Sequence, residues 1–204
     1  MIRCYRIPFS TNVERVALAA GHKGLEIEWI DVEPTDRSPV ELVSGQSHVP
    51  VLLDGPEVIA DSPRIVAHLE NRFPDPPLYP HDPARRAEVE TFVDWFNHVW
   101  KRPPNLIACE LEKEHPDAVK IVEWSVAMGH AVHRFEALLA GRDYLFGEFG
   151  VADVIAFPFL KYASLGVSDG DDELFHQILV EHQPLEPGSP LHAWVARVDA
   201  HPRA

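Results

Sequence analysis

A proline-rich segment divides the chain into two parts with different patterns. Residues 73–83 read Phe-Pro-Asp-Pro-Pro-Leu-Tyr-Pro-His-Asp-Pro and contain five prolines. Because proline has a fixed φ and no backbone N–H, this segment can continue neither a helix nor a central strand. Strand and helix signals alternate before it, whereas only helix-period patterns follow it. We therefore expect an N-terminal domain at 1–74, a linker at 75–83 and a C-terminal domain at 84–204.

The N-terminal part alternates between short apolar runs and amphipathic stretches. We expect strands at 2–5, 25–32, 50–53 and 58–60, and helices at 13–20 and from 62 onward. A turn at Asp54-Gly55-Pro56 pairs the last two strands as an antiparallel hairpin. Ser62 is a favoured N-cap, and Pro63 fits the first helical position. The order β-α-β, a connecting segment, then β-β-α predicts an α/β domain with a mixed sheet and helices packed against it.

The C-terminal part shows only helical periodicity. Apolar stripes recur at about 84–100, 118–139, 151–165, 171–180 and 191–198, which predicts an all-α bundle. On the first of these helices, the aromatic residues Phe92, Trp95, Phe96 and Trp100 form a cluster. Such a cluster indicates core or a subunit interface, and alternatively one wall of an apolar pocket.

The acidic composition makes some partners improbable. The chain has 18 basic and 32 acidic residues and a formal net charge of -14, so its field repels phosphate backbones and anionic lipid surfaces. We expect neither nucleic acid nor a membrane as a partner. The N-terminus lacks an apolar stretch typical of a signal peptide, and no run is long enough to span a membrane, so we expect a cytoplasmic protein.

Neither the cysteines nor the histidines follow a metal-binding pattern. Cys4 and Cys109 are too few and too far apart for a disulfide framework or a thiolate zinc site. His130 and His133 can share one helix face, but no carboxylate motif accompanies them. We expect two solvated helix residues and no metal.

Four local motifs resemble the glutathione S-transferase family, and they occur in the family's order along nearly the whole chain. In residues 8–16, a serine stands five positions before an arginine, as in serine-type, phi- and theta-like bacterial-style members; here these are Ser10 and Arg15. Residues 47–50, Ser-His-Val-Pro, resemble the loop before the third strand, where the Val-Pro bond is cis. The other two motifs are Asp61-Ser62, similar to an acidic-Ser pair at the third helix, and residues 150–153, similar to a buried helix-capping motif.

The resemblance implies a thioredoxin-like N-terminal domain, a helical C-terminal domain, a homodimer and glutathione as co-substrate. A thiol with a pKa near 8.5 is only a few per cent thiolate at neutral pH, and the thiolate is the nucleophile. A hydroxyl donor at Ser10 and the helix that starts near Asn12 both favour the anion. Thr11 and Asn12 are rival donors. The plainer interpretation is that Ser10 or Thr11 only caps the helix.

The resemblance also implies how glutathione binds. The backbone of Val49, before a cis Pro50, pairs with the peptide-like ligand as an added strand does, and His48 stands next to it. Asp61 suits the ligand's ammonium, and Ser62 at a helix start suits its carboxylate. The alternatives are a proline that starts a strand and an ordinary N-cap. We expect Phe9 and Trp95 to line the pocket of a small-molecule electrophile.

The sequence departs from the family pattern at three places. His48 replaces a common glutamine, Gly150 replaces a serine or threonine cap, and the first loop has no cysteine, while Cys4 lies in an expected strand and is buried and inert. The leading hypothesis is an enzyme that transfers activated glutathione to an electrophile or reduces an organic hydroperoxide. The alternatives are a catalytically silent binding or stress protein of the same fold, and a glutathione-dependent isomerase or dehalogenase.

Overall fold

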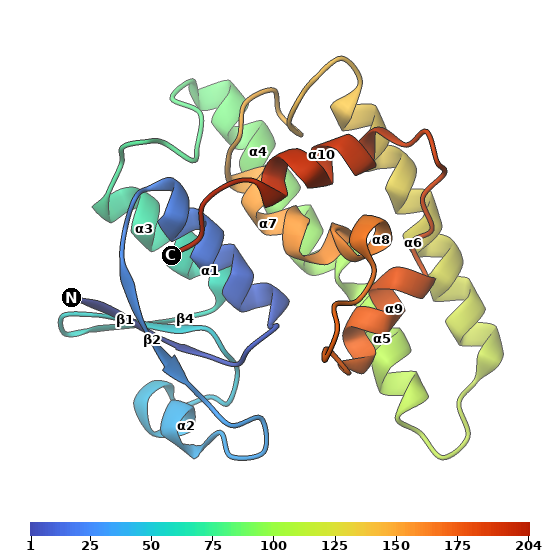
Figure 1. Ribbon diagram of the computed structural model, residues 1–204, viewed down its shortest axis with the longest axis horizontal. Coiled ribbons are helices and arrows are strands. Elements are labelled where there is room, and N and C mark those ends of the chain that lie inside the picture. The colour runs from blue at the N-terminus through green and yellow to red at the C-terminus, as the bar shows by residue number, and fades with distance from the viewer. The chain divides into compact units, whose positions relative to one another are not determined.

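The computed structural model describes all 204 residues and contains two compact units (Figure 1). The first unit comprises Met1–Pro80 together with Ala200–Ala204, and the second comprises His81–Asp199. The five C-terminal residues thus return to the N-terminal unit after the last helix. The proline-rich residues up to Pro80 also belong to this first unit.

The first unit is built on a four-stranded mixed sheet. Its strand order is β2-β1-β3-β4, where β1 is Ile2–Arg6, β2 is Ile27–Asp31, β3 is Val51–Asp54 and β4 is Glu57–Ala60. β1 and β2 are parallel, and the other two pairs are antiparallel. α1 (Thr11–His22) and α3 (Ser62–Arg72) lie side by side along one face of the sheet, and α2 (Ser38–Ser44) lies on the other (Figure 1). This confirms the thioredoxin-like βαβ-ββα fold.

The connecting segment of the first unit holds a short helix, α2, which the sequence analysis left out. Pro39 occupies its first turn, and Gly45 ends it in the left-handed conformation with φ 72°. Only Val40 is buried, against a small core that includes Ile7, Val32 and Val51. A single buried position leaves no apolar stripe, so the start and stop residues are the only local signals of this helix.

All named elements of the second unit are helices, which confirms the expected bundle. Its elements are α4 (Pro83–Trp95), the π-helical turn η1 (Phe96–Trp100), α5 (Arg102–Leu111), α6 (Ala118–Leu139), α7 (Val151–Leu160), α8 (Tyr162–Leu165), α9 (Leu174–Glu181) and α10 (Pro190–Asp199). The helix α5 was not expected from the sequence. Pro103 and Pro104 suggest a break, but they occupy the first turn of this helix, where proline costs no hydrogen bond.

The aromatic cluster of α4 and η1 forms the core of the helical unit. Phe96 stacks on Trp100 with ring centroids 4.4 Å apart, and edge-on contacts follow to Phe135 of α6 and Phe159 of α7 at 6.1 and 5.6 Å. Phe92 is buried beside them. The structure therefore favours the core alternative for Phe92, Phe96 and Trp100, because neighbouring helices already cover these rings.

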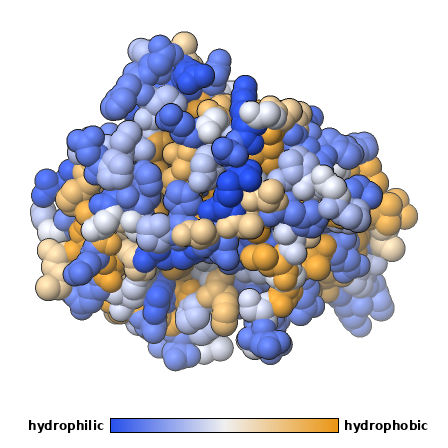
Figure 2. All heavy atoms as spheres, turned by 45° about the horizontal axis from the view of Figure 1, so that its top comes forward, coloured by the Kyte–Doolittle hydropathy of each residue, from blue (hydrophilic) through white to orange (hydrophobic).

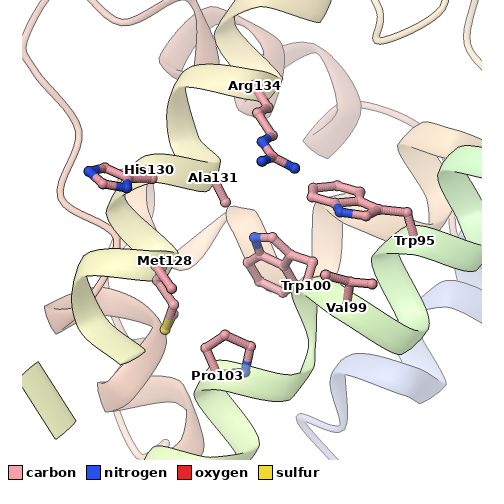
Figure 3. Close-up of a pocket in the computed structure, with 9 residues that line it drawn as sticks. Trp95, Val99, Trp100, Pro103, Met128, His130, Ala131 and Arg134 are labelled. Carbon is pink, nitrogen blue, oxygen red and sulfur yellow. The ribbon is translucent and has the colours of Figure 1, made fainter. Parts of the chain in front are cut away.

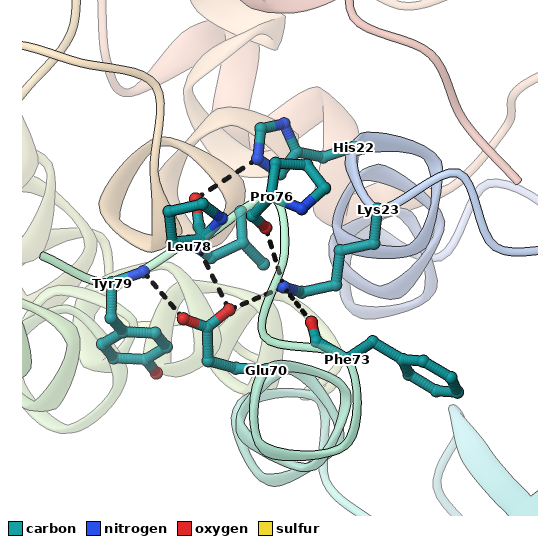
Figure 4. Close-up of polar contacts among 8 residues, drawn as sticks. His22, Lys23, Glu70, Phe73, Pro76, Leu78 and Tyr79 are labelled. Atoms are coloured by element: carbon teal, nitrogen blue, oxygen red, sulfur yellow. Dashed lines mark hydrogen bonds and ion pairs between the residues drawn. The ribbon is translucent and has the colours of Figure 1, made fainter. Parts of the chain in front are cut away.

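A buried ion pair fixes the proline-rich segment to the first unit (Figure 4). The Lys23 ammonium lies 2.7 Å from the Glu70 carboxylate and donates to the backbone carbonyls of Phe73 and Pro76 at 2.7 and 2.9 Å. Glu70 in turn accepts the N–H groups of Leu78 at 3.0 Å and Tyr79 at 3.3 Å. Backbone groups of the proline-rich segment thus form hydrogen bonds with both charged groups, and these bonds explain how a lysine and a glutamate can be buried there.

Replacing Lys23 with methionine should lower the free energy of unfolding by about 3 kcal/mol, because Glu70 then stays buried without its cation. Urea denaturation measures this loss. The matched control is Lys120→Met, since the Lys120 side chain is 53% exposed and its removal should change stability by less than about 0.5 kcal/mol. A loss below about 1 kcal/mol for Lys23→Met would mean that other contacts hold the segment.

The C-terminal residues pack closely on α1. The N–H of Ala204 donates to the Ala17 carbonyl at 3.1 Å, and the Trp29 indole donates to the Ala204 carbonyl at 3.1 Å. Gly21 makes this approach possible, because a Cβ atom there would lie 2.1 Å from the Pro202 carbonyl oxygen. An alanine at position 21 would displace the C-terminal segment.

The face shown in Figure 2 mixes apolar and polar side chains. Exposed apolar residues include Val119, Val122 and Val126 on α6. No helix has the length and apolarity that a membrane span requires.

Candidate functional site

The strand register brings three loops of the first unit to one edge of the sheet. Val51, the first residue of β3, pairs with Tyr5 near the end of β1 and with Ala60 at the end of β4. The loop from β1 into α1, the Val49–Pro50 turn and the entry into α3 therefore adjoin the same edge. Each family-like motif of this domain lies on one of these three segments.

Ser10 is the N-cap of α1. Its Oγ accepts the backbone N–H of Val13 at 3.4 Å, and the side chain is half-buried. Accepting this bond uses an oxygen lone pair, so the hydroxyl proton can still be donated to a ligand. Capping and donation are therefore compatible roles. Thr11 is buried, and the Asn12 side chain accepts a hydrogen bond from Arg15.

Arg15 joins the starts of α1 and α3. Its side chain is fully buried, and one terminal nitrogen (NH1) donates to Asn12 Oδ1 at 3.3 Å and to Ser62 Oγ at 3.2 Å. Ser62 Oγ donates to the same Asn12 oxygen at 3.3 Å, which closes a triangle. Burial lowers the pKa of the Arg15 guanidinium to about 9, and the Asp61 carboxylate raises it in the opposite direction. Arg15 therefore remains charged at neutral pH.

Two residues of the site have a backbone conformation that side chains disfavour. Phe9 has φ 63°, and Asp61 has φ 76°. Such left-handed residues outside glycine cluster at functional sites, where the surrounding structure holds them. Phe9 is 54% exposed. Asp61 is exposed too and makes no side-chain cap with α3, so it is open to a ligand on the side of the helix start.

The Val49–Pro50 bond is cis, as expected from the resemblance. Pro50 is buried at the start of β3, and Val49 precedes the β3 ladder, which begins at Val51. Gln46 shapes the loop, since its side chain accepts the His48 N–H at 2.6 Å and donates to the His48 carbonyl at 2.9 Å. The His48 ring is exposed.

Sequence patterns identify Arg15 only as part of a motif, and they indicate no role for Gln46. The signal for Arg15 was a charged residue inside the apolar stretch Val13–Ala20. Such a residue is buried only when polar partners satisfy it. Its partners lie on a different helix, and local sequence does not reveal them.

The comparisons with known proteins agree with this geometry. The family model described as glutathione S-transferase, N-terminal domain, matches residues 5–77. Glutathione S-transferase 1 of Dianthus caryophyllus is 36% identical over 167 residues, which cover 77% of this chain and 75% of that protein. The chain belongs to the glutathione S-transferase family.

Two further members show the breadth of the family around this chain. Maleylacetoacetate isomerase of Pseudomonas aeruginosa is 27% identical over 183 residues, covering 79% of this chain and 81% of the relative. A theta class glutathione S-transferase from Xanthomonas axonopodis pv. citri, solved with glutathione bound, has a TM-score of 0.72 and 25% identity, with 98% and 92% of the two chains covered. The function of the present chain is glutathione transferase-like.

The remaining candidate residues that the sequence singled out lie in the helical unit of this glutathione S-transferase family member. Trp95 is half-buried, and its ring centroid lies 5.8 Å from that of Phe92 and 5.8 Å from that of Phe135. Asp153, in the capping motif, lies at the start of α7 and is wholly buried. His133 lies 3.0 Å from the Glu136 carboxylate, and no group of three or more His, Cys, Asp or Glu residues is arranged to hold a metal ion.

Proposed function

We propose that this protein activates the thiol of glutathione at Ser10 and transfers it to a small electrophile or uses it to reduce an organic hydroperoxide. The observation that carries the proposal is the Asn12–Arg15–Ser62 triangle, which ties the start of α1 to the start of α3. Two helix N-termini next to one another provide positive dipoles for two anionic groups. Glutathione has both groups, a thiolate and a γ-glutamyl carboxylate.

In this proposal each segment of the sheet edge takes one part of the ligand. The Val49 backbone, at the cis bond to Pro50, pairs with the cysteinyl part, and the exposed His48 ring stands beside it. The carboxylate of the γ-glutamyl end takes the free helix start at Ser62, and the Asp61 carboxylate takes its ammonium. The Ser62 hydroxyl is already engaged with Asn12 and Arg15, so the helix N–H groups are the better donors.

We propose that Phe9 contacts the electrophile, because it follows β1 and is exposed beside Ser10. The identity of the electrophile depends on such apolar residues. Because the thiol site is shared by several reactions, the similarity to maleylacetoacetate isomerase favours a glutathione-dependent isomerase as the second candidate. The remaining alternatives are a dehalogenase and a silent binding protein.

Ser10→Ala should raise the pKa of bound glutathione by about one to two units, because a hydrogen bond to a charged group contributes about 1.5 to 3 kcal/mol. The thiolate fraction at neutral pH then falls, and turnover of a generic aryl halide should drop roughly tenfold to a hundredfold. The binding constant should change much less, since the Val49 and Ser62 contacts remain. Thiolate absorbance of the bound ligand against pH measures the shift directly.

Thr11→Ala and Asn12→Ala are the controls for this assignment. A raised thiol pKa in either variant, with an unchanged pKa in Ser10→Ala, would transfer the donor role to Thr11 or Asn12. No change in any of the three would refute activation by a side-chain donor. If titration of the wild type shows no glutathione binding at tens of millimolar, the silent protein is the correct alternative.

We also propose a homodimer in the cytoplasm. The sequence leaves open a subunit interface at the aromatic cluster, but Phe92, Phe96 and Trp100 are buried in the helical core. The exposed apolar face of α6 is the better candidate, with Val119, Val122 and Val126 at 78%, 62% and 51% exposure. Light scattering should give about twice the chain mass of 23.0 kDa. A Val122→Glu variant should shift the mass toward the monomer.

A further inference from the structure

Ser164 and His192 form a hydrogen-bonded pair in the helical unit that the proposed thiol chemistry does not use. Ser164 lies on α8 and His192 near the start of α10, and Ser164 Oγ is 2.8 Å from His192 Nδ1. Both residues are half-buried and belong to the second unit. Neither residue lines the apolar pocket beside Trp95 and Trp100 that Figure 3 shows. The pair is therefore a separate feature of this unit.

A backbone carbonyl determines which nitrogen of His192 carries the proton. His192 Nε2 lies 3.2 Å from the Glu186 carbonyl oxygen, which can only accept a hydrogen bond. Nε2 is therefore the protonated nitrogen of the neutral ring, and Nδ1 has a lone pair that accepts the Ser164 hydroxyl proton. A nucleophile, a base and a group that orients the base are the parts of a nucleophilic triad, here with a carbonyl in place of the usual carboxylate.

The Ser164 hydroxyl differs from other helical hydroxyls of this chain in its partner. Serine and threonine side chains in helices commonly donate to the carbonyl four residues earlier. Ser44 donates to the Val40 carbonyl at 2.8 Å, and Thr91 donates to the Ala87 carbonyl at 2.7 Å. The Ser164 hydroxyl instead contacts an imidazole, which can accept its proton completely.

The surroundings of the pair favour a small neutral substrate with an aromatic ring. Leu165, which follows Ser164, is 57% exposed, and Ala193, which follows His192, is exposed as well. These apolar side chains offer contact to a ring, and the net charge of -14 repels anionic substrates. Phenols have a pKa of about 10, so the oxygen of an aryl ester leaves more readily than an alkoxide.

We propose that Ser164 is a nucleophile toward small neutral aryl esters and that His192 is its general base. Ser164 Oγ attacks the ester carbonyl carbon while its proton passes to His192 Nδ1. The bond to the aryl oxygen then breaks, Nδ1 returns the proton to this oxygen, and a phenol leaves. Water hydrolyses the acyl group on Oγ by the same route, which releases a carboxylic acid and restores Ser164. This site goes beyond the proposed function, because neither Ser10 nor glutathione takes part in it.

Labelling with diisopropyl fluorophosphate tests the proposal in the absence of glutathione. An activated serine attacks this reagent at phosphorus, and fluoride leaves. Peptide mass spectrometry should find the adduct on Ser164. His192→Gln should lower the labelling rate about a hundredfold or more, because a general base contributes about 10²- to 10⁴-fold. The matched control is Ser168→Ala, at an exposed serine of the following loop, and it should be labelled like the wild type.

Hydrolysis of p-nitrophenyl acetate without glutathione is the second measurement. Ser164→Ala and His192→Gln should each lower its rate about tenfold or more, whereas Ser168→Ala should keep the wild-type rate. A serine that only joins α8 to α10 would leave this rate unchanged.

Three results would overturn the proposal. They are the absence of an adduct on Ser164 at millimolar reagent, equal labelling rates for the wild type and His192→Gln, and an unchanged rate of ester hydrolysis in Ser164→Ala. Circular dichroism verifies that each variant is folded, and the labelling of the wild type needs no variant. Ser10→Ala should be labelled at Ser164 like the wild type, so failure of this site and failure of the thiol chemistry are separate observations.

Discussion

Replacing Arg15 with methionine should leave the protein folded and weaken glutathione binding by about tenfold or more. Methionine fills most of the buried volume, and the hydrogen-bond partners of Arg15, Asn12 and Ser62, are uncharged, so the exchange leaves no buried charge without its partner. The triangle then loses the two hydrogen bonds that Arg15 donates, so only the bond from Ser62 Oγ to Asn12 Oδ1 still joins the starts of α3 and α1. A loss of about 1.4 kcal/mol in binding corresponds to the tenfold change. Calorimetric titration of glutathione into the variant measures it.

Three further variants separate positioning by Arg15 from a merely structural role. Arg15→Ala leaves a cavity and should lower the free energy of unfolding by about 3 kcal/mol. Arg15→Lys keeps the charge but lacks the planar guanidinium with its several N–H donors. Relative to Arg15→Ala, it should therefore recover more of the folding stability than of the affinity for glutathione. Arg64→Met, at an exposed position of α3, should change neither.

Two measurements distinguish positioning by Arg15 from a purely structural role: the dissociation constant of glutathione and the pKa of its bound thiol. Arg15→Met should raise the dissociation constant of glutathione while the pKa of the bound thiol shifts less than in Ser10→Ala. Equal thiol shifts in the two variants would instead place Arg15 in the activation of the sulfur. Unchanged affinity in Arg15→Met would show that the triangle does not position the ligand site.

The elements that were predicted correctly are those whose signals are local. Periodicity located the strands and most helices, and Ser62-Pro63 located the start of α3. The expected cap was wrong by one residue, because Asp61 is the N-cap and Ser62 is the first residue of the helix. The helices α2 and α5 were not predicted, and prolines occupy the first turns of both. A proline at a helix start and a proline in a loop look alike until the flanking apolar pattern is counted.

The parts of the site that were not predicted depend on contacts between distant residues. Arg15 lies 47 positions before Ser62 in the sequence, and Lys23 lies 50 positions before the Phe73 carbonyl that it holds. The docking of Ala204 on Ala17 and Trp29 joins the two ends of the chain. Burial of a charge is decided by such partners and not by its neighbours in sequence. The motifs therefore located the site, whereas only the fold revealed what supports it.

Asp153→Ala should lower the free energy of unfolding by about 3 to 5 kcal/mol, the largest stability loss that we expect for a single residue. The wholly buried carboxylate accepts the backbone N–H of Leu145 at 3.0 Å and of Gly150 at 3.1 Å, and the Trp194 indole N–H at 2.8 Å. It thus joins the preceding loop, the start of α7 and α10. Its removal leaves three buried donors without an acceptor, and each costs about 1 to 3 kcal/mol.

Gly150 makes the fold more dependent on Asp153. A serine or threonine cap would accept the first-turn N–H through its side chain, but glycine has none, and here the Gly150 carbonyl accepts the Asp153 N–H at 3.0 Å. Gly150→Ser should therefore add a cap and stabilise the protein by a few tenths of a kcal/mol. Urea denaturation of both variants measures the two effects. A loss below about 1 kcal/mol in Asp153→Ala would contradict a central role for this carboxylate.

The charge of Asp153 also makes stability depend on pH. Burial raises the pKa of this carboxyl from 3.8 to about 6, although four N–H groups, including that of Asp153 itself, lower the pKa. Because the folded state holds the proton more tightly than the unfolded state, this group's contribution is complete below pH 3.8 and is lost as the pH rises through 6. Between pH 7 and pH 5, the wild type should therefore gain about 1 kcal/mol relative to Asp153→Asn, which cannot ionise. Parallel pH dependences of the two proteins would show that Asp153 does not titrate in this range.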